Sequence, residues 1–600
     1  MPLLKRFLSE LDKPSRVGSV VFLALTAVLL LGIVGYFQMD LTAPTNITGD
    51  HLFFLTMAKS YINGHGFRFD SQLGYPGVRD SLYFPSFDLS YRLLLWVGAR
   101  MTHNPFILVH GLYIVCFSAM ALTYHWTLRR LGASAWLAVV GALASIVTPF
   151  VQGRSFGHDA LALSFSVPMG FGLALLIGQN AKAGSVKTFF RDPFVWASVL
   201  VVGVSGLYYA FFTVMICLVV GAATGLGERR AFPILAAGVS SVAIFVLLLF
   251  SGYGFDLPIV LSGRLSQPHR MAYEQLLYGL DFSSAAVQFR FLPHVGERYQ
   301  TAFDAVKYAF PSVQGGEWPG VTLTSIILSS PFVAIIGQTA LPDLREPSAS
   351  KLRLLVLTAM CLLFLLIFSV QGGLGFIFNL IVTPEIRATE RVMPFLTFGA
   401  VVMFCTAAEL ARDADRRWVR YLGPVFVAVL LIAAMPKYLH SAIKWQSSYL
   451  AQPMVQELQK SIQAMLRVKD QAGFRTVLEL PTLDWPETPA PVDDYNAYQH
   501  QLPYIYDRPG SRTRWSYGSN DRQIAFTRLD MQTKHAESLV ERMRKVGFDS
   551  ILVEKKAYAP NELAKVQAAL GAQLAPACRL YEDDFMALYA MNRAPGGKAC

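Results

Sequence analysis

Residues 17–37 read VGSVVFLALTAVLLLGIVGYF, an uncharged apolar run about as long as a lipid bilayer is thick. About 20 such residues in a helix span roughly 30 Å of hydrocarbon. Similar runs recur along the chain as far as Tyr438. The composition agrees, with 53% hydrophobic and 16% charged residues and a mean hydropathy of +0.40. We therefore predict an α-helical polytopic membrane protein.

Basic residues in the short loops set the predicted orientation, because Lys and Arg stay on the cytoplasmic side during insertion. The N-terminal segment carries basic residues from Lys5 to Arg16 and is predicted to be cytoplasmic. It reads as the start of a retained first span, since the apolar run is too long for a cleavable leader. Counting between the later basic clusters gives about eleven crossings. The predicted spans are Val17–Phe37, Pro105–Leu128, Ala135–Val151, Ala160–Gly178, two within Phe194–Gly227, Ala231–Phe250, Val321–Ala340, Leu354–Val370, Val392–Leu410 and Tyr421–Tyr438.

The stretch Phe194–Gly227 contains no charge and is too long for one upright helix. A single crossing would move the basic residues from Arg229 to Arg420 to the outer face, so we predict a helical hairpin that turns near Ser205 to Tyr209. The odd total then places the C-terminal domain outside. The predicted division is a GT-C-like transmembrane domain at 1–440, with large outer loops at 38–104 and 251–320, and a soluble extracytoplasmic α/β domain at 441–600.

Two of the six cysteines, Cys578 and Cys600, lie in the predicted outer domain. The exported side is oxidising, so these two cysteines could form a disulfide. The other four lie in apolar runs and are interpreted as small buried hydrophobic residues. The net charge of +11 comes largely from the cytoplasmic loops. We read it as a topology signal and predict no nucleic-acid binding.

The first outer loop carries the densest set of polar candidates. Asp50 and His51 open the amphipathic stretch that ends at Gly64, and Asp80 and Asp88 follow. Asp50 could simply cap that helix. An amphipathic helix in the membrane interface would instead hold the Asp50 carboxylate where it can act as a base on a substrate whose tail stays in lipid.

Two further loops place polar candidates at the same outer surface. The connection RSFGHD carries Arg154, His158 and Asp159, and ionisable groups at such depth pair with one another, mark a site, or do both. The second long loop contains GGEWPG, where Glu317 precedes Trp318 and an acid stands beside an aromatic ring that could stack on a sugar.

The segment EIRATERVMPF supplies the cationic candidates. Arg387 and Arg391 are four residues apart, so on a helix they would share one face. Two guanidinium groups on one face suit a phosphate or diphosphate. Internal pairing with Glu385 and Glu390 is the alternative.

At this point the chain resembles the GT-C class of integral membrane glycosyltransferases, and within it a group of bacterial membrane proteins related to the YfhO family. The resemblance runs over almost the whole chain and implies an enzyme of the bacterial inner membrane that takes a sugar from a polyprenyl-phosphate carrier. The blocks that carry it are GDHLFFL, LGYPGVRDSLYFP, RSFGHD, GLYYAFF, EIRATERVMPF, RTRWSYG and GFDSILVEKKAY.

Residue by residue, the resemblance matches Asp50 to the loop carboxylate that acts as general base or holds a metal. Many members have two neighbouring acids there, whereas here His51 follows, which leaves metal dependence open. If a divalent metal (Mg²⁺ or Mn²⁺) takes part, Asp50 and Asp80 are its predicted ligands, with Asp88 as the other carboxylate considered. The implied reaction is inverting displacement at the anomeric carbon, with a glycan or lipid acceptor. The predicted substrate-binding residues are His51, Asp80, Arg154, His158, Asp159, Glu317, Arg387 and Arg391.

The tail from about Ser441 reads as a small α/β unit. TVLEL, SILVE and FMALYAM are predicted strands, and SYLAQPMVQELQKSIQAMLR and NELAKVQAAL are predicted helices. The segment between the first two strands carries aromatic residues that either bind sugar or form a local core. They are Trp485, Tyr495, Tyr498, Tyr504, Tyr506, Trp515 and Tyr517.

Three function classes remain open at this stage. A glycosyltransferase that uses a lipid-linked sugar is favoured. A transporter or flippase of lipid-linked saccharide is second, because a basic membrane cavity would serve either task, although no inverted repeat is evident. A non-catalytic envelope assembly protein is third. The sequence contains no P-loop, dinucleotide glycine pattern, CxxC or HExxH motif, so we predict no nucleotide or zinc site.

Overall fold

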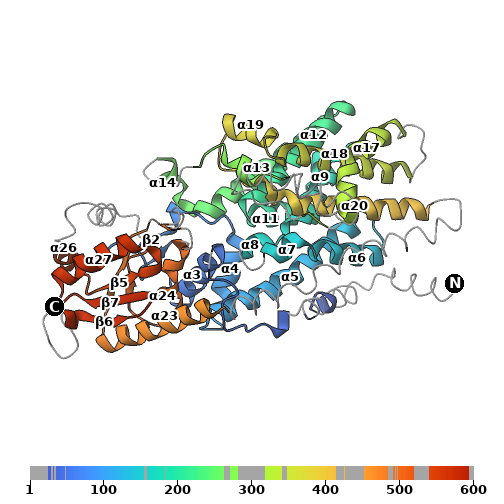
Figure 1. Cartoon of the computed structure of the whole chain (residues 1–600). Helices are drawn as coiled ribbons and strands as arrows, with labels where there is room; N and C mark the ends of the chain where they lie inside the picture. The colour runs from blue at the N-terminus through green and yellow to red at the C-terminus, as the bar shows by residue number, and fades with distance from the viewer. Residues whose placement is uncertain are drawn as a thin grey trace, which may run out of the picture.

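The computed structural model describes residues 36–281, 318–340, 348–413, 452–518 and 539–592, with short gaps inside these ranges, and a few isolated positions elsewhere. A long helical body makes up most of the molecule, and a β-sheet flanked by helices lies at one end of it (Figure 1). The first outer loop, with α3 (Asp50–Ile62) and α4 (Leu89–Gly98), lies between the two.

Within the described ranges, six helices are long and apolar enough to cross a membrane. They contain α5 (Pro105–Arg130), α9 (Ser166–Gln179), α12 (Leu207–Gly227), α13 (Ala231–Tyr253), α18 (Ser348–Ser369) and α20 (Met393–Arg412). Shorter apolar helices accompany them: α6 (Ala135–Ile146), α11 (Pro193–Gly203) and a stretch of α17 (Val321–Ala340).

All of these helices fall on predicted spans, so the multi-pass character of the chain is confirmed. The predicted span Val17–Phe37 is described only at residues 24–28, 32 and 36–37, and the predicted span Tyr421–Tyr438 only at residue 425. The total of about eleven crossings therefore stays a prediction.

The predicted pair of helices within Phe194–Gly227 is found, with α11 and α12 separated by Val204–Gly206, and the two crossings of the membrane stay a prediction. Just before α11, Asp192 pairs with Arg130 at the end of α5. Beyond the other end of α11, the Val204 carbonyl accepts a hydrogen bond from the Ser90 amide at 3.0 Å. Gly206 has a φ of +107°, which favours glycine at the turn.

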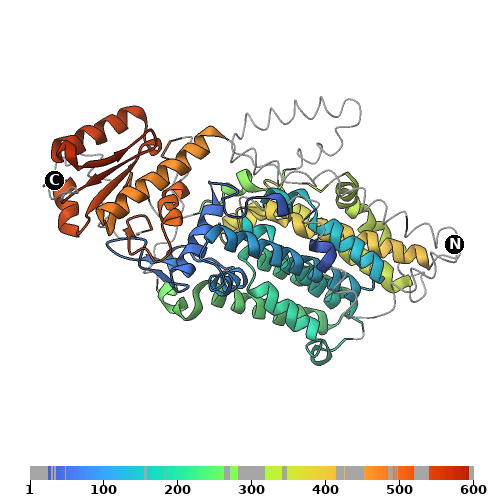
Figure 2. The ribbon, with the colours of Figure 1, turned by 90° about the horizontal axis from the view of Figure 1, so that it is seen from below.

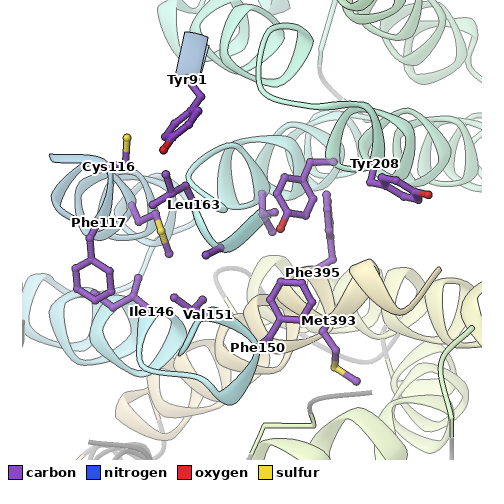
Figure 3. Close-up of a cluster of buried hydrophobic side chains, with 14 of the residues drawn as sticks. Tyr91, Cys116, Phe117, Ile146, Phe150, Val151, Leu163, Tyr208, Met393 and Phe395 are labelled. Atoms are coloured by element: carbon purple, nitrogen blue, oxygen red, sulfur yellow. The ribbon is translucent and has the colours of Figure 1, made fainter. Parts of the chain in front are cut away.

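The helical body is held together by close approach of small residues and by aromatic packing, as membrane helix interfaces generally are. A Cβ added to Gly170 of α9 would lie 2.1 Å from Thr213 Oγ1 of α12. The Phe212 and Phe395 rings of α12 and α20 lie 5.9 Å apart. Figure 3 shows Phe395 and Met393 of α20 beside Phe150 of α7 (Pro149–Arg154) in this interior.

The basic ends of several membrane helices gather together. Arg353 pairs with Glu228 at 3.0 Å, and Lys351 pairs with Asp413 at 2.7 Å. These pairs tie the start of α18 to the ends of α12 and α20.

A five-stranded mixed sheet lies near the C-terminus in the order β4-β3-β5-β7-β6. Strands β4, β3 and β5 are parallel, and β5, β7 and β6 are antiparallel. Helices of the same segment flank it (Figures 1 and 2). The strands are β3 (Thr476–Leu480), β4 (Arg514–Trp515), β5 (Ser550–Glu554), β6 (Arg579–Glu582) and β7 (Met586–Ala590), and the helices are α23 (Pro453–Ala472), α24 (Leu502–Tyr506), α26 (Leu539–Val546) and α27 (Pro560–Gln573).

The strands predicted from TVLEL, SILVE and FMALYAM are therefore confirmed as β3, β5 and β7, and both predicted helices are found as α23 and α27. The predicted domain boundary at 440/441 lies outside the described residues. Cys578 is buried and disulfide-bonded, while Cys600 lies outside the described residues. The four cysteines in apolar helices are buried free thiols, as predicted.

The first outer loop is hydrogen-bonded to the edge of this sheet. The Gly74 amide donates to the Tyr517 carbonyl and the Tyr75 amide donates to the Trp515 carbonyl, both at 3.0 Å. Close by, β1 (Phe69–Asp70) pairs with β2 (Arg79–Asp80). The loop and the C-terminal segment are thus packed as one unit at the end of the membrane helices.

Candidate active site

A cavity of about 370 Å³ lies where the first long loop (residues 38–104) meets the start of α12 and the end of α13. Its volume falls in the range of small-molecule sites. Its charged and polar lining comes from parts of the chain that are far apart in sequence and includes Asp50 and Asp88; His158; Tyr208 and Tyr209; Arg270; Glu385, Arg387 and Arg391; and Tyr498.

Asp50 is the first residue of α3, where the positive end of the helix dipole favours a carboxylate. His158 Nδ1 lies 2.6 Å from Asp50 Oδ2, and the Asp50 side chain is 34% exposed. Burial alone would raise the pKa of Asp50. The hydrogen bond and charge of His158, the charge of Arg391 and the Tyr498 hydroxyl outweigh this effect and hold the pKa below 3.8. Asp50 is therefore ionised at neutral pH and faces the cavity.

The two predicted arginines also line the cavity, but not through helical spacing. Arg387 lies in a non-helical segment after α19 (Leu374–Ile381), and Arg391 lies in the 3₁₀ turn η6 (Thr389–Val392). Arg387 pairs with Glu274 of α15 (Glu274–Tyr278), a partner that the sequence did not predict.

Arg391 differs from Arg387 in its partners. Its guanidinium lies 4.3 Å from the centre of the Tyr208 ring, and no carboxylate within the described residues pairs with it. Its Nε is buried without a hydrogen-bond partner in the part of the chain that the structure describes. An arginine with uncommitted donors in a cavity is suited to an anionic ligand.

Three predicted binding residues do not line this cavity. His51 is fully buried and contacts Thr45 at 3.2 Å, because neighbouring residues on a helix point to different sides. Asp80 pairs with Arg68 at 3.1 Å and accepts the Leu82 amide. Arg154 is buried in an ion pair with Glu390 at 2.9 Å.

Two other predicted residues cannot be placed. Asp159 opens α8 (Asp159–Ala162), but its side chain lies outside the described part of the chain. Glu317 also lies outside the described residues. Its neighbour Trp318 is 1% exposed and donates to the Asp281 carbonyl at 3.0 Å, so this ring is part of the core and not an open sugar platform.

Of the predicted metal pair, Asp80 is bound to Arg68 and is not among the residues that line the cavity with Asp50, so its role as a metal ligand stays a prediction. Within the described residues, no group of three or more His, Cys, Asp or Glu side chains could hold a metal ion. Asp88 is the carboxylate that shares the cavity with Asp50, and both lie in the field of Arg391. Mg²⁺ is often held by one or two carboxylates together with waters and substrate phosphates, so dependence on a divalent metal stays a prediction.

Tyr498 is the contribution that sequence reasoning missed. It was one of seven candidate aromatics, and the structure separates it from the others. Trp515, Tyr504 and Tyr517 are buried in the core, which favours the local-core alternative for them, whereas Tyr498 lines the cavity and its hydroxyl reaches Asp50. It lies in η8 (Ala497–Gln501), which packs on α3.

No protein-family model and no curated protein matches the sequence. Among solved structures, the chain is similar to the arabinofuranosyltransferase AftD from Mycobacteria, with 12% identity and a TM-score of 0.49 over 96% of this chain. That alignment spans 40% of AftD. It is also similar to ArnT from Cupriavidus metallidurans, with 13% identity and a TM-score of 0.42 over 96% of this chain and 98% of that one. At these values the likeness assigns no family or activity.

Proposed function

We propose that this chain is a membrane glycosyltransferase that moves a sugar from a polyprenyl-phosphate carrier to a glycan or lipid acceptor on the outer face of the membrane. One observation carries the proposal: the ionised Asp50 lines the same cavity as Arg391, which forms no ion pair with a carboxylate of the described residues, at the ends of membrane-spanning helices. A base and an anion site in one pocket are the two groups that displacement of a phosphate from a sugar requires.

The location of the cavity supports a lipid-linked substrate on the outer face. Helices α12, α13 and α20 each have one end near the cavity. Basic residues, including Arg230 and Arg412, lie at or beside their other ends. Basic loops mark the cytoplasmic side, so the cavity belongs to the outer side. A carrier could then keep its polyprenyl tail in lipid while its phosphate reaches Arg391.

In the proposed reaction, the acceptor hydroxyl oxygen bonds to the anomeric carbon while the bond from that carbon to the phosphate oxygen breaks. The hydroxyl proton passes to the Asp50 carboxylate, which His158 holds in place. The bonding electron pair leaves with the lipid phosphate, and Arg391, with Arg387, stabilises the charge that develops there.

Two variants test this function separately. Asp50→Asn keeps the size of the side chain but removes the base, so transfer from a panel of polyprenyl-phosphate pentoses and hexoses should fall by roughly 100-fold or more. Binding of polyprenyl phosphate itself should persist. Arg391→Gln should lose that binding, whereas Arg353→Gln, at the far end of the helices, should keep it.

Unchanged transfer by Asp50→Asn, or unchanged polyprenyl-phosphate binding by Arg391→Gln, would reject the assignment. A transporter would show carrier movement across a vesicle membrane without release of free polyprenyl phosphate. A scaffold would show neither activity and would not respond to either variant.

A further inference from the structure

A second carboxylate, that of Asp88, lines the proposed transfer cavity without a protein partner. Asp88 occupies the N-cap position of α4, where an aspartate usually accepts a hydrogen bond from the helix amides, but its side chain makes no such bond. No other hydrogen bond to its carboxylate is found within the described residues. The carboxylate is turned away from its own helix and toward the cavity.

Contacts from two other parts of the chain fix the backbone around Asp88. Ser251 Oγ donates to the Phe87 carbonyl at 2.6 Å and accepts from the Leu89 amide at 3.1 Å, so the residues on both sides of Asp88 are held by one hydroxyl. Gly206 lies against the carboxylate itself, because a Cβ added there would be 2.6 Å from Asp88 Oδ1. A side chain placed this firmly without a protein partner is a preorganised acceptor.

The surroundings of Asp88 indicate which ligand it would accept. Aromatic residues Tyr83, Phe84 and Phe87 line the same cavity on its side. Arg391 and Arg92 already supply positive charge near the carboxylate, so a cationic ligand is disfavoured. A phosphate would be repelled. A sugar ring fits this lining. Its neutral hydroxyl groups can donate hydrogen bonds to the carboxylate, and its C–H faces can stack on the aromatic side chains.

We propose that Asp88 is the hydroxyl-binding residue of a sugar subsite, in which it accepts hydrogen bonds from the hydroxyls of a sugar ring packed against these aromatic residues. The inference rests on the proposed function, since it places the sugar beside the phosphate site at Arg391. The ring is that of the donor or of the acceptor, and the same chemistry serves both.

Titration of Asp88 gives this subsite a distinct signature. Burial raises the pKa of Asp88 to about 6, against the positive charges of Arg391 and Arg92. Below that pH the group becomes a neutral acid and loses its charge-assisted hydrogen bonds. Sugar binding by the natural chain should therefore weaken as the pH falls through about 6.

The test compares two probes: polyprenyl phosphate, which carries no sugar, and the same carrier linked to pentoses or hexoses. Asp88→Asn should bind polyprenyl phosphate as well as the natural chain does. Its affinity or KM for one sugar substrate should worsen by about 10- to 100-fold, and the dependence near pH 6 should vanish. A change confined to the carrier-linked sugar identifies the donor ring, and a change confined to the acceptor identifies the acceptor ring.

Gly206→Ala provides a second variant, because it displaces the carboxylate without removing it and should reproduce the loss for the same substrate. Because φ at Gly206 is +107°, the alanine also strains the turn, so the matched control is Gly132→Ala, where φ is +96° and an added Cβ meets nothing within 4 Å. If Asp88→Asn leaves both sugar substrates within twofold, or weakens polyprenyl phosphate equally, the subsite is rejected. If the natural chain binds sugar-linked carriers through Asp88 but transfers nothing, the subsite stands and the transferase proposal fails.

Discussion

Replacing Glu479 by glutamine should make the protein less sensitive to alkaline pH. Glu479 lies on β3 and is 1% exposed. Its Oε2 accepts the Tyr517 amide at 2.7 Å, but its Oε1 has no hydrogen-bond partner in the described part of the chain. Burial raises the pKa of Glu479 to about 8, although His500 nearby favours the charged form.

The size of the effect follows from the change in proton affinity on folding. The pKa of Glu479 rises from an ordinary value of 4.5 to about 8 on folding. At about 1.4 kcal/mol per pKa unit, this shift lets pH change the unfolding free energy by about 5 kcal/mol in total. Between these values the folded chain holds a proton that the unfolded chain has released, so its stability falls as the pH rises. This contribution is full below pH 4.5 and is lost as the pH approaches 8.

The measurement is the unfolding stability of the natural chain and of Glu479→Gln between pH 6 and pH 8. The natural chain should lose roughly 2 kcal/mol relative to the variant over this range. The control is Glu541→Gln, since Glu541 is an exposed residue of α26 paired with Lys545 and should give no such trend. Parallel stability curves for Glu479→Gln and the natural chain would show that Glu479 is not a buried neutral acid.

Two further predictions concern other residues around the cavity. Tyr498→Phe removes a hydroxyl that stabilises the Asp50 carboxylate, so the pKa of Asp50 should rise and the acidic limb of the kcat/KM profile should move to higher pH, with KM for the carrier little changed. Arg154→Met leaves the buried Glu390 carboxylate without its ion-pair partner, so the unfolding free energy, measured by denaturation, should fall by about 3–5 kcal/mol. The double variant that also carries Glu390→Gln should recover part of this loss.

Properties that depend on local sequence were predictable. Uncharged runs predicted the positions of the membrane helices, and the charge-free stretch Phe194–Gly227 was recognisable as two helices because it is too long for one upright helix. Asp50, Arg387 and Arg391 were expected to lie at one outer surface, and they line one cavity. The reason is topological, since loops on the same side of a bundle have little room to diverge.

Contacts that depend on tertiary packing were not predictable. The RSFGHD connection contains both Arg154 and His158, and nothing in their spacing indicates that one pairs with Glu390 while the other binds Asp50. Asp80 looked as available as Asp88, but the β1–β2 pairing places it beside Arg68. Recruitment of Tyr498 depends on the packing of η8 against α3, which no periodicity in the sequence encodes.

The two arginines are not equivalent in the proposed chemistry. A phosphate that approached Arg387 would have to compete with Glu274, whereas Arg391 has no carboxylate to displace within the described residues. The charge of Arg391 also helps to hold the pKa of Asp50 low. A phosphate bound at Arg391 would offset that charge and raise the proton affinity of Asp50. Binding of the donor would thus make Asp50 a stronger base at the moment when an acceptor proton must be removed, which links the anion site to the base through electrostatics alone.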